Sequence, residues 1–512
     1  MNAVESYLLP CGILGFLISL GISLGLRRMY GTSGVLGRAT EFHHHPSAER
    51  IPRLGGICIV GGFLAVCIAA LIIHQGAPLR SLKFWAIAGC SLGMFTVGII
   101  DDFRALGAKR KLIFQILLAI MAYLSGIRIE QFKMPFLSET IPLQQWGFLV
   151  TVLWLVAMTN LINLIDGIDG LAGGIGVLMM GLLAWVGFSL EGGFYSLLCV
   201  GILGALLGFL RFNFPPARIY MGDGGAYFIG FFIGLISIET SNKGTVAAAL
   251  TAPLLALALP IIDTTLALLR RASKGLPLFR PDLDHIHHRM MGRNQNKTRT
   301  VLTLYAFSMI AMGFAIAIFI SSGRYVPVLI GAAAVVLVSA LRYLSLIPSL
   351  KSAWPILRNH LRLRRHSRYL LGLTASLEME AENCDSLDHL WTNYEILAGK
   401  AGLDRIRVRL NGTERTWHGQ ELESSHWYRR HGSPNSHHME LEFYCRKSRF
   451  AEDEFEHVTN LAAEAWHKAV SRWTMTNRPP SSLTSGAPEA SGNYRFETAP
   501  NFVTDLAPRK TR

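Results

Sequence analysis

Long apolar runs recur through roughly the first 350 residues of this chain. A run of about 20 apolar residues is long enough for a helix to cross the hydrocarbon core of a bilayer. Because lipid offers no hydrogen-bond partners, a helix that satisfies its own backbone is the expected structure for each run. The sequence therefore predicts an all-α polytopic membrane protein. About 11 transmembrane helices are expected, at residues 7–26, 54–73, 84–100, 112–127, 147–165, 171–190, 194–210, 225–240, 245–269, 300–320 and 326–347.

The composition also favours a membrane protein over a soluble enzyme. Of the 512 residues, 51% are hydrophobic and only 16% are charged, and such values are typical of polytopic chains. The net charge of +14 does not imply a nucleic-acid partner, because membrane proteins concentrate Lys and Arg on one side. The seven cysteines lack the spacing of a metal site or a disulfide framework, so we expect buried or free thiols.

The charge of the loops predicts the orientation. One set of alternate loops carries roughly three times as many Lys and Arg as the other, and it comprises 27–53, 101–111, 166–170, 211–222 and 270–299. The positive-inside rule places this set and the C-terminus in the cytoplasm, and an odd number of spans then places the N-terminus outside. The first apolar run has no basic segment before it and no cleavage site, so we expect a retained span rather than a signal peptide.

The composition changes after the last apolar run, which predicts four regions. Residues 1–348 form the transmembrane domain, and residues 349–368 form a basic linker suited to lie against anionic lipid. Residues 369–475 are expected to form a small cytoplasmic α/β domain, with helices at 387–401 and 451–473 and strands at 405–410 and 439–444. Residues 476–512 are rich in Pro, Ser and Gly and are expected to be a disordered tail.

The most informative polar motif lies where the run 147–165 ends. Asn160, Asn163, Asp166 and Asp169 follow one another at three-residue spacing and lead into a glycine-rich turn. Amide and carboxylate oxygens are hard ligands that suit Mg²⁺, and glycine lets the backbone approach a phosphate closely. The alternative is a polar helix end with an Asx turn.

Further acidic groups fall on the same predicted side. Asp101 and Asp102 directly follow an apolar run, where adjacent carboxylates repel one another and need a cation or a shared proton. The alternative is a solvated loop start paired with Arg104 and Lys109. Asp223 lies in a glycine turn before another apolar run, which is a weak signal by itself.

Basic and neutral polar groups complete this set. Arg280, His285, His287 and His288 crowd into one short loop, where sugar or pyrophosphate contact fits better than a tetrahedral zinc site. Arg53 lies just before Gly55 and Gly56, so its positively charged side chain could lie near a bound anion. We expect His43 to His45 to be a polar loop. Asn213 is either a helix cap or a substrate contact.

The gathering of these groups at one aqueous side favours an enzyme that joins a soluble charged donor to a lipid acceptor. Carboxylates, Mg²⁺ and arginines suit pyrophosphate chemistry, which depends on positioning and charge neutralisation. The alternative is a transporter or flippase of lipid-linked or anionic substrates. Such a protein would place its charges near mid-membrane, and only Asp263 partly meets that expectation. A membrane metallohydrolase would need better-spaced His and carboxylate ligands.

Six motifs in order carry a family resemblance that spans roughly residues 8–346. They are Pro52–Gly56, Asp101–Asp102, Asn160–Ala172, Met221–Gly224, Pro260–Asp263 and His285–His288. As a set they resemble the polyprenyl-phosphate N-acetylhexosamine-1-phosphate transferases, which are of the glycosyltransferase family 4 type. The same superfamily contains the phospho-N-acetylmuramoyl-pentapeptide translocases.

The resemblance implies a bacterial inner-membrane enzyme that requires Mg²⁺, for which Mn²⁺ could substitute. It would transfer a sugar 1-phosphate from a UDP-N-acetylhexosamine to undecaprenyl or another polyprenyl phosphate, and release UMP. This is the first membrane step of a cell-envelope glycan pathway. The spacing from His285 to His288 resembles the branch that uses UDP-N-acetylglucosamine, whereas the muramoyl-pentapeptide branch has three adjacent histidines.

The resemblance also implies residue roles. Asp101, Asp102 and Asp223 would be catalytic, with the first two near the acceptor phosphate, and Asn163 and Asp223 would hold the metal. Tyr220 would stack on the uracil. The implied substrate contacts are Arg53, Asn160, Asp166, Asp169, Asn213, Tyr220, Arg280, His285, His287 and His288.

Two segments depart from the family pattern. His43 to His45 stand where relatives have a Lys and a His at set spacing, so no role is carried over to that loop. The region after residue 348 exceeds the family core and loosely resembles GAF-like sensory modules. A homodimer is compatible with the transferase that the resemblance implies.

Overall fold

A computed structural model describes residues 5–32, 51–73, 81–133, 140–189, 193–243, 254–255, 257–276, 296–321, 325–343, 350–410, 413–419, 426–431 and 439–476. The chain divides into two compact units, and each is described by itself. The first unit comprises Met1–Thr40, Ala48–Ala267 and Asp282–Pro348. The second comprises Glu41–Ser47, Leu268–Pro281 and Ser349–Arg512.

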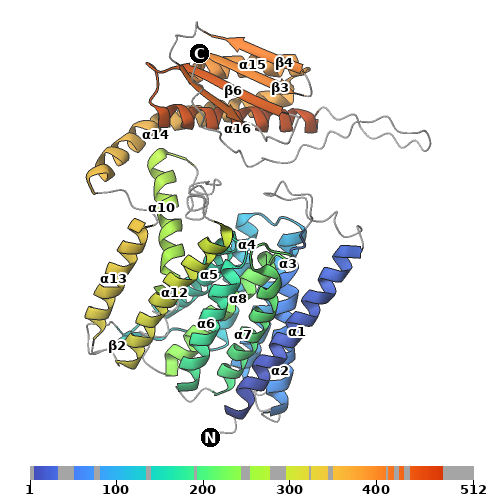
Figure 1. Cartoon of the computed structure of the whole chain (residues 1–512), viewed down its shortest axis with the longest axis vertical. Helices are drawn as coiled ribbons and strands as arrows, with labels where there is room; N and C mark the ends of the chain where they lie inside the picture. The colour runs from blue at the N-terminus through green and yellow to red at the C-terminus, as the bar shows by residue number, and fades with distance from the viewer. Residues whose placement is uncertain are drawn as a thin grey trace, which may run out of the picture. The chain divides into compact units, whose positions relative to one another are not determined.

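The first unit is a bundle of helices, which Figure 1 shows in blue to yellow. Its only described strands, β1 (Gln131–Lys133) and β2 (Thr140–Pro142), pair in an antiparallel hairpin. The helices up to α8 are α1 (Glu5–Thr32), α2 (Gly55–Ile73), α3 (Leu82–Phe103), α4 (Ala108–Leu124), α5 (Trp146–Ile165), α6 (Leu171–Ser189), α7 (Gly193–Asn213) and α8 (Gly222–Lys243). They are followed by α10 (Ala258–Lys274), α12 (Lys297–Ile320) and α13 (Val326–Tyr343). Only the residues of α10 up to Ala267 belong to the first unit.

Seven of the described helices are long and apolar enough to cross a membrane. Their spans are Ser6–Met29, Gly55–Ile73, Leu82–Phe103, Trp146–Ile165, Leu171–Ser189, Phe194–Asn213 and Lys297–Ile318. A mostly helical, multi-pass membrane protein is therefore confirmed. The other four expected spans overlap α4, α8, α10 and α13, and part of 245–269 lies outside the described residues. The number of 11 spans stays a prediction.

Helix α8 lies in the interior of the bundle, with contacts to α2, α3, α5 and α6. Its aromatic side chains Phe228, Phe231 and Phe232 are fully buried. Small residues let its neighbours approach closely, as is common between membrane helices. A Cβ on Gly98 of α3 would lie 2.5 Å from the Asp223 carbonyl oxygen, and one on Gly230 would lie 2.7 Å from the Met158 carbonyl oxygen of α5. Glycine therefore places α8 against the backbones of α3 and α5.

The second unit contains a four-stranded antiparallel sheet of order β4-β3-β6-β5. The strands are β3 (Arg405–Leu410), β4 (Thr413–His418), β5 (His426–His431) and β6 (Met439–Arg446). The helices are α14 (Leu350–Glu380), α15 (Leu387–Ala401) and α16 (Glu452–Thr476), with a 3₁₀ turn η3 at Ala381–Asn383. Inward-facing Ile406 and Phe443 form one core with Tyr394 of α15 and Trp466 of α16. The segments predicted as helices and strands from periodicity coincide with α15, α16, β3 and β6 to within a few residues.

Helix α14 crosses the expected boundary at residue 368 between linker and domain. The basic stretch lies on the same helix as the first residues of the expected domain. Leu363, Leu370 and Leu377 recur every seven residues and are buried, so they make one apolar stripe along the helix. That stripe explains why the helix continues through a segment dominated by arginine.

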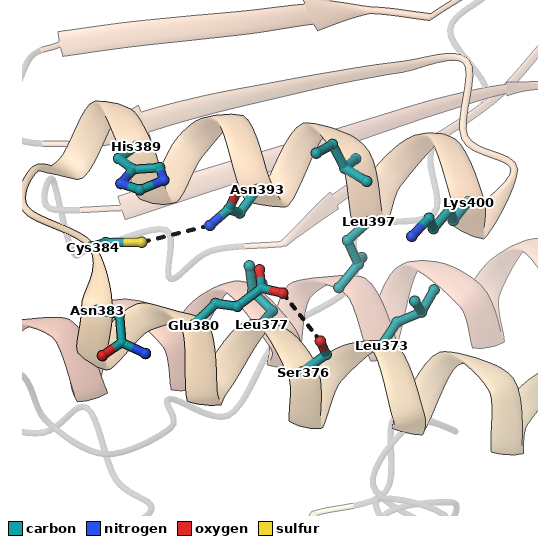
Figure 2. A pocket seen from close by; sticks show the side chains of 11 residues that line it. Leu373, Ser376, Leu377, Glu380, Asn383, Cys384, His389, Asn393, Leu397 and Lys400 are labelled. Carbon is teal, nitrogen blue, oxygen red and sulfur yellow. Dashed lines mark hydrogen bonds between the residues drawn. The ribbon is translucent and has the colours of Figure 1, made fainter.

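A pocket of about 410 Å³ opens between α14 and α15 in the second unit (Figure 2). Leu373, Leu377 and Leu397 line it together with polar groups that include His389 and Cys384. The Asn393 amide donates a hydrogen bond to the Cys384 sulfur. Burial raises the pKa of the Cys384 thiol, so the thiolate needed for nucleophilic chemistry is disfavoured. The predicted site residues that the structure describes all lie in the first unit.

Replacing Gly98 by Ala should destabilise the first unit. The new Cβ would lie 2.5 Å from the Asp223 carbonyl oxygen and 2.5 Å from the Gly224 Cα, and neither backbone atom can move without shifting α8. Overpacking of this kind usually costs about 1–3 kcal/mol, so the midpoint of thermal unfolding in detergent should fall. Gly89 of the same helix has no atom within 4 Å of its Cβ position, and Gly89→Ala is the matched control. Equal midpoints would contradict the close α3–α8 packing.

Candidate active site

Two sequence motifs that lie far apart in the chain are joined by backbone hydrogen bonds. Tyr220 N donates to Pro52 O, Gly55 N to Tyr220 O and Gly56 N to Met221 O, each at 2.9 Å. A Cβ on Gly56 would lie 2.6 Å from Gly225 N, so only glycine permits this approach. The start of α2 is therefore attached to the turn that precedes α8, and Arg53 lies in the joined segment.

Asp102 caps the N-terminus of α8. Its two carboxylate oxygens accept hydrogen bonds from the backbone N–H of Asp223 at 3.0 Å and of Gly224 at 3.1 Å. The first N–H groups of a helix have no partner within the helix, and a carboxylate there also interacts favourably with the helix dipole. Gly222 has φ +75° and leaves no room for a Cβ, which would lie 2.7 Å from Asp102 Oδ2. Asp102 therefore positions the backbone that carries Asp223.

The Asp223 carboxylate is held by two side chains from other helices. Asn163 Nδ2 of α5 donates to Oδ1 at 3.1 Å, and Lys111 Nζ of α4 lies 3.2 Å from Oδ2. Lys111 also forms an ion pair with Asp101 Oδ2, whose Oδ1 accepts a hydrogen bond from Leu106 N at 2.8 Å. The structure thus brings Asp101, Asn163 and Asp223 together around one ammonium group.

Lys111 was missed by sequence reasoning, which named Arg104 and Lys109 as the cations beside Asp101 and Asp102. All three bases follow the acidic pair within a few residues, and composition cannot rank them. Arg104 precedes α4, whereas Lys109 and Lys111 lie in its first turn and point in different directions. Only the fold shows which of the three faces Asp223.

The glycine turn after α5 is held by a buried amide. Asn213 is 2% exposed; its Oδ1 accepts from Gly170 N and its Nδ2 donates to Ile219 O, both at 3.0 Å. Tyr305 of α12 donates to the Gly170 carbonyl at 2.5 Å. Asn213 thus joins this turn to the segment before α8. Both polar ends of its amide are engaged with backbone, and its predicted substrate contact stays a prediction.

Asp169 and Asn160 have identified partners as well. Asp169 Oδ2 accepts from Ala217 N at 3.3 Å and lies 3.9 Å from Lys297 Nζ of α12. Asn160 and Gln115 of α4 exchange amide hydrogen bonds of 2.7 and 3.3 Å. Lys297, Tyr305 and Gln115 carried no signal in the sequence, because single polar residues in apolar helices are common.

The site holds an excess of negative charge. Burial raises the pKa of Asp166 well above its ordinary value, and the negative charges of Asp223 and Asp102 raise it further. Arg53 acts in the opposite direction. The carboxylates of the site are Asp101, Asp102, Asp166, Asp169 and Asp223, and the bases acting on them include Arg53, Lys111 and Lys297. A divalent cation would offset the difference.

The donor atoms also suit a hard cation. Carboxylate and amide oxygens are the ligands that Mg²⁺ prefers, usually through one or two carboxylates plus substrate phosphate. Among the residues described, no group of three or more His, Cys, Asp or Glu side chains is arranged to hold a metal ion. Asn163 and Asp223, whose side chains lie together, offer one amide oxygen and one carboxylate of this kind.

The remaining predicted residues divide into two groups. Tyr220 is half-buried, and burial raises its pKa, with a further contribution from the charge of Asp169; its hydroxyl is therefore neutral. Arg280, His285, His287 and His288 lie outside the described residues, as do His43 to His45. The sugar contacts expected of this loop stay a prediction.

Comparison with known proteins gives concordant matches. The model of glycosyl transferase family 4 matches residues 84–241. A probable undecaprenyl-phosphate N-acetylglucosaminyl 1-phosphate transferase of Bacillus subtilis (strain 168) is 35% identical, over 51% of this chain and 71% of that protein. The decaprenyl-phosphate N-acetylglucosaminephosphotransferase of Mycolicibacterium smegmatis is 32% identical, over 61% of this chain and 81% of that protein. A phospho-N-acetylmuramoyl-pentapeptide-transferase of Listeria innocua is 29% identical, over 52% of this chain and 83% of that protein.

Replacing Asn213 by Asp should destabilise the first unit. Aspartate cannot donate to the Ile219 carbonyl and would place a second acceptor against it, in a position that water does not reach. A buried group left unpaired usually costs about 1–3 kcal/mol, so the midpoint of thermal unfolding should fall. Asn383→Asp, at an exposed position of the second unit, is the control. An unchanged midpoint for Asn213→Asp would show that this amide does not hold the two segments.

Proposed function

The chain belongs to glycosyl transferase family 4, and from that premise we propose that it transfers a sugar 1-phosphate to a membrane lipid. The donor is a UDP-N-acetylhexosamine, with N-acetylglucosamine as the sugar, and the acceptor is a polyprenyl phosphate such as undecaprenyl phosphate. The products are a polyprenyl-diphosphate-sugar and UMP. The names of the relatives from Bacillus and Mycolicibacterium support this sugar and this class of acceptor.

One observation of the structure carries the proposal. Asp223 lies at the capped N-terminus of α8, where side chains from α3, α4 and α5 meet. This arrangement offers carboxylates, an ammonium group and glycine-lined backbone at one end of the bundle. Transfer of a phosphoryl-linked sugar between two anions needs this combination, since catalysis there depends on positioning and charge neutralisation.

Lys111 and Arg53 are suited to bind the diphosphate of the donor. Lys111 already lies between Asp101 and Asp223, so an incoming phosphate would share its ammonium group with these carboxylates. Arg53 lies in the segment joined to Tyr220. Tyr220, neutral and half-buried, offers an aromatic face near this position for the uracil.

Asp101 and Asp102 act mainly through position. Both oxygens of Asp102 are bonded to the α8 backbone, and Asp101 is bonded to Lys111 and Leu106. A polyprenyl phosphate is already ionised at neutral pH, so the attacking oxygen needs no strong base. We therefore assign Asp102 to holding Asp223 in place and Asp101 to orienting Lys111.

Asn163 and Asp223 would hold Mg²⁺, with Asp166 nearby to balance its charge. When bound, the ion would neutralise charge on the diphosphate and on the departing UMP. The excess of carboxylates and the oxygen donors support this assignment. Mn²⁺ has similar ligand preferences and is expected to substitute.

We place the enzyme in a bacterial inner membrane. About 11 helices would cross it, with the N-terminus outside and the active site and C-terminus in the cytoplasm, as the distribution of Lys and Arg among the loops favours. A transporter or flippase is disfavoured, because the described charged cluster gathers at one end of the bundle and the relatives are named as transferases. We keep a homodimer as a compatible assembly.

The reaction is tested with the purified full chain in detergent. We expect UMP release that requires undecaprenyl phosphate, Mg²⁺ and UDP-N-acetylglucosamine, together with formation of the matching lipid product. A panel of UDP-sugars identifies the donor, and omission of the lipid is the control. A folded protein that releases no UMP from any donor in the panel would overturn the proposed reaction.

Asp223→Asn should reduce turnover by about 100-fold or more, the usual effect of losing one electrostatic contact to developing charge. The substitution removes one charge and little volume, so the midpoint of thermal unfolding should stay close to that of the unmodified protein. Asp385→Asn removes an exposed carboxylate of the second unit and should leave turnover unchanged. Near-normal turnover in Asp223→Asn would eliminate this residue as a metal ligand.

A further inference from the structure

A buried ion pair lies outside the site described above. Glu239 of α8 is 2% exposed, and its two carboxylate oxygens lie 2.9 and 3.2 Å from Lys83 Nζ of α3. The Lys83 side chain is 40% exposed. A carboxylate buried among apolar helices is unfavourable unless it is paired, and ionisable groups inside membrane bundles usually have a function.

The pair is remote from the reaction. Glu239 follows Asp223 by 16 positions along the same helix, which corresponds to about 24 Å at 1.5 Å per residue. It therefore cannot contact the donor diphosphate or the metal. Tyr195 of α7 also lies next to the Glu239 carboxylate, so the pair joins three helices at the end of the bundle opposite to Asp223.

Helix α3 contacts α8 near both of its ends. At the end near Asp223, Asp102 caps α8 and Gly98 lies against its backbone. At the other end, Lys83 in the first turn of α3 binds Glu239. The two helices run antiparallel, and each of their ends is held by a side chain of α3.

Helix α5 contacts α8 in a similar way. Asn163 donates to the Asp223 carboxylate, and Trp154 Nε1 donates to Ser237 Oγ at 3.0 Å. Between these two bonds, Gly230 and Gly234 of α8 lie against Leu155, Met158 and Thr159 of α5. Polar bonds between membrane helices fix their register.

We propose that Lys83 and Glu239 form a remote positioning pair for the sugar-phosphate transfer. By fixing the register of α8 against α3, the pair keeps the Asp223 carboxylate between Asn163 and Lys111. A displacement of about 1 Å at a reacting centre can reduce a rate by roughly 100-fold, so this distant contact affects turnover. The inference rests on the proposed function for its effect on rate, but the positioning of α8 can be measured without the reaction.

The test compares variants of the full chain in detergent. Lys83→Met removes the ammonium group and keeps the stem of the side chain, whereas Lys83→Arg retains the charge. In Lys83→Met we expect kcat to fall at least about 10-fold with the KM for UDP-N-acetylglucosamine within about two-fold, because the donor contacts are intact. Lys83→Arg should restore kcat. Arg128→Met removes an exposed ion pair with Glu130 and should change neither quantity.

Amide hydrogen exchange of residues 220–228 provides the readout that is independent of the reaction. The Asp223 and Gly224 N–H groups bond to Asp102, so they should exchange at least about 10-fold faster in Lys83→Met than in the unmodified chain. Exchange should be unchanged in Lys83→Arg and Arg128→Met. If Lys83→Met does not fold, Lys83→Met/Glu239→Gln removes the unpaired charge and serves as the second variant, with the same expectations.

The outcomes separate the two proposals. If the unmodified chain releases no UMP, the proposed function fails, and the exchange experiment alone decides whether the pair positions α8. If the chain is active but the folded variant without the pair keeps normal exchange and normal kcat, the positioning inference is overturned. A second result would also overturn it: Lys83→Arg loses kcat as Lys83→Met does, while amide exchange in Lys83→Arg stays unchanged. The inference attributes the effect on kcat to the positive charge of Lys83, and arginine keeps that charge.

Discussion

The site depends on a contact between two membrane helices, in which Asp102 at the end of α3 binds the first N–H groups of α8. Those N–H groups have no partner within the helix itself. The contact needs both helices to approach until their backbones touch, and Gly98, Gly222 and Gly224 permit that approach. The position of Asp223 follows, because its own N–H donates one of the two hydrogen bonds to Asp102.

A second constraint is the balance of charge around Asp223. Carboxylates from three segments converge on Lys111 and Arg53, and burial together with the negative charges of Asp223 and Asp102 raises the pKa of Asp166. Such a cluster is unfavourable by itself and becomes favourable when a divalent cation and an anionic substrate enter together. The arrangement thus favours binding of both components over binding of either alone.

The second unit follows different physical rules. Its core is formed by one face of an antiparallel sheet against three helices, and its charged residues form cross-strand pairs such as Arg407 with Glu442. The pocket between α14 and α15 is lined by a neutral thiol and by groups without the arrangement of a catalytic centre. The chemistry proposed above rests on side chains of the first unit, among them Asn163, Lys111 and Asp223.

The sequence by itself determined the membrane class, the order of the acidic motifs and the family, because apolar length and local motifs are properties of contiguous residues. Even the helix α15 and the strands β3 and β6 could be predicted from periodicity. The partners of the site residues could not: Lys111 rather than Lys109 faces Asp223, Asn213 joins two segments, and Asp102 caps a helix more than 100 residues away. Only the tertiary structure decides these contacts, because they depend on which faces of separate helices meet and on the small residues that let them approach.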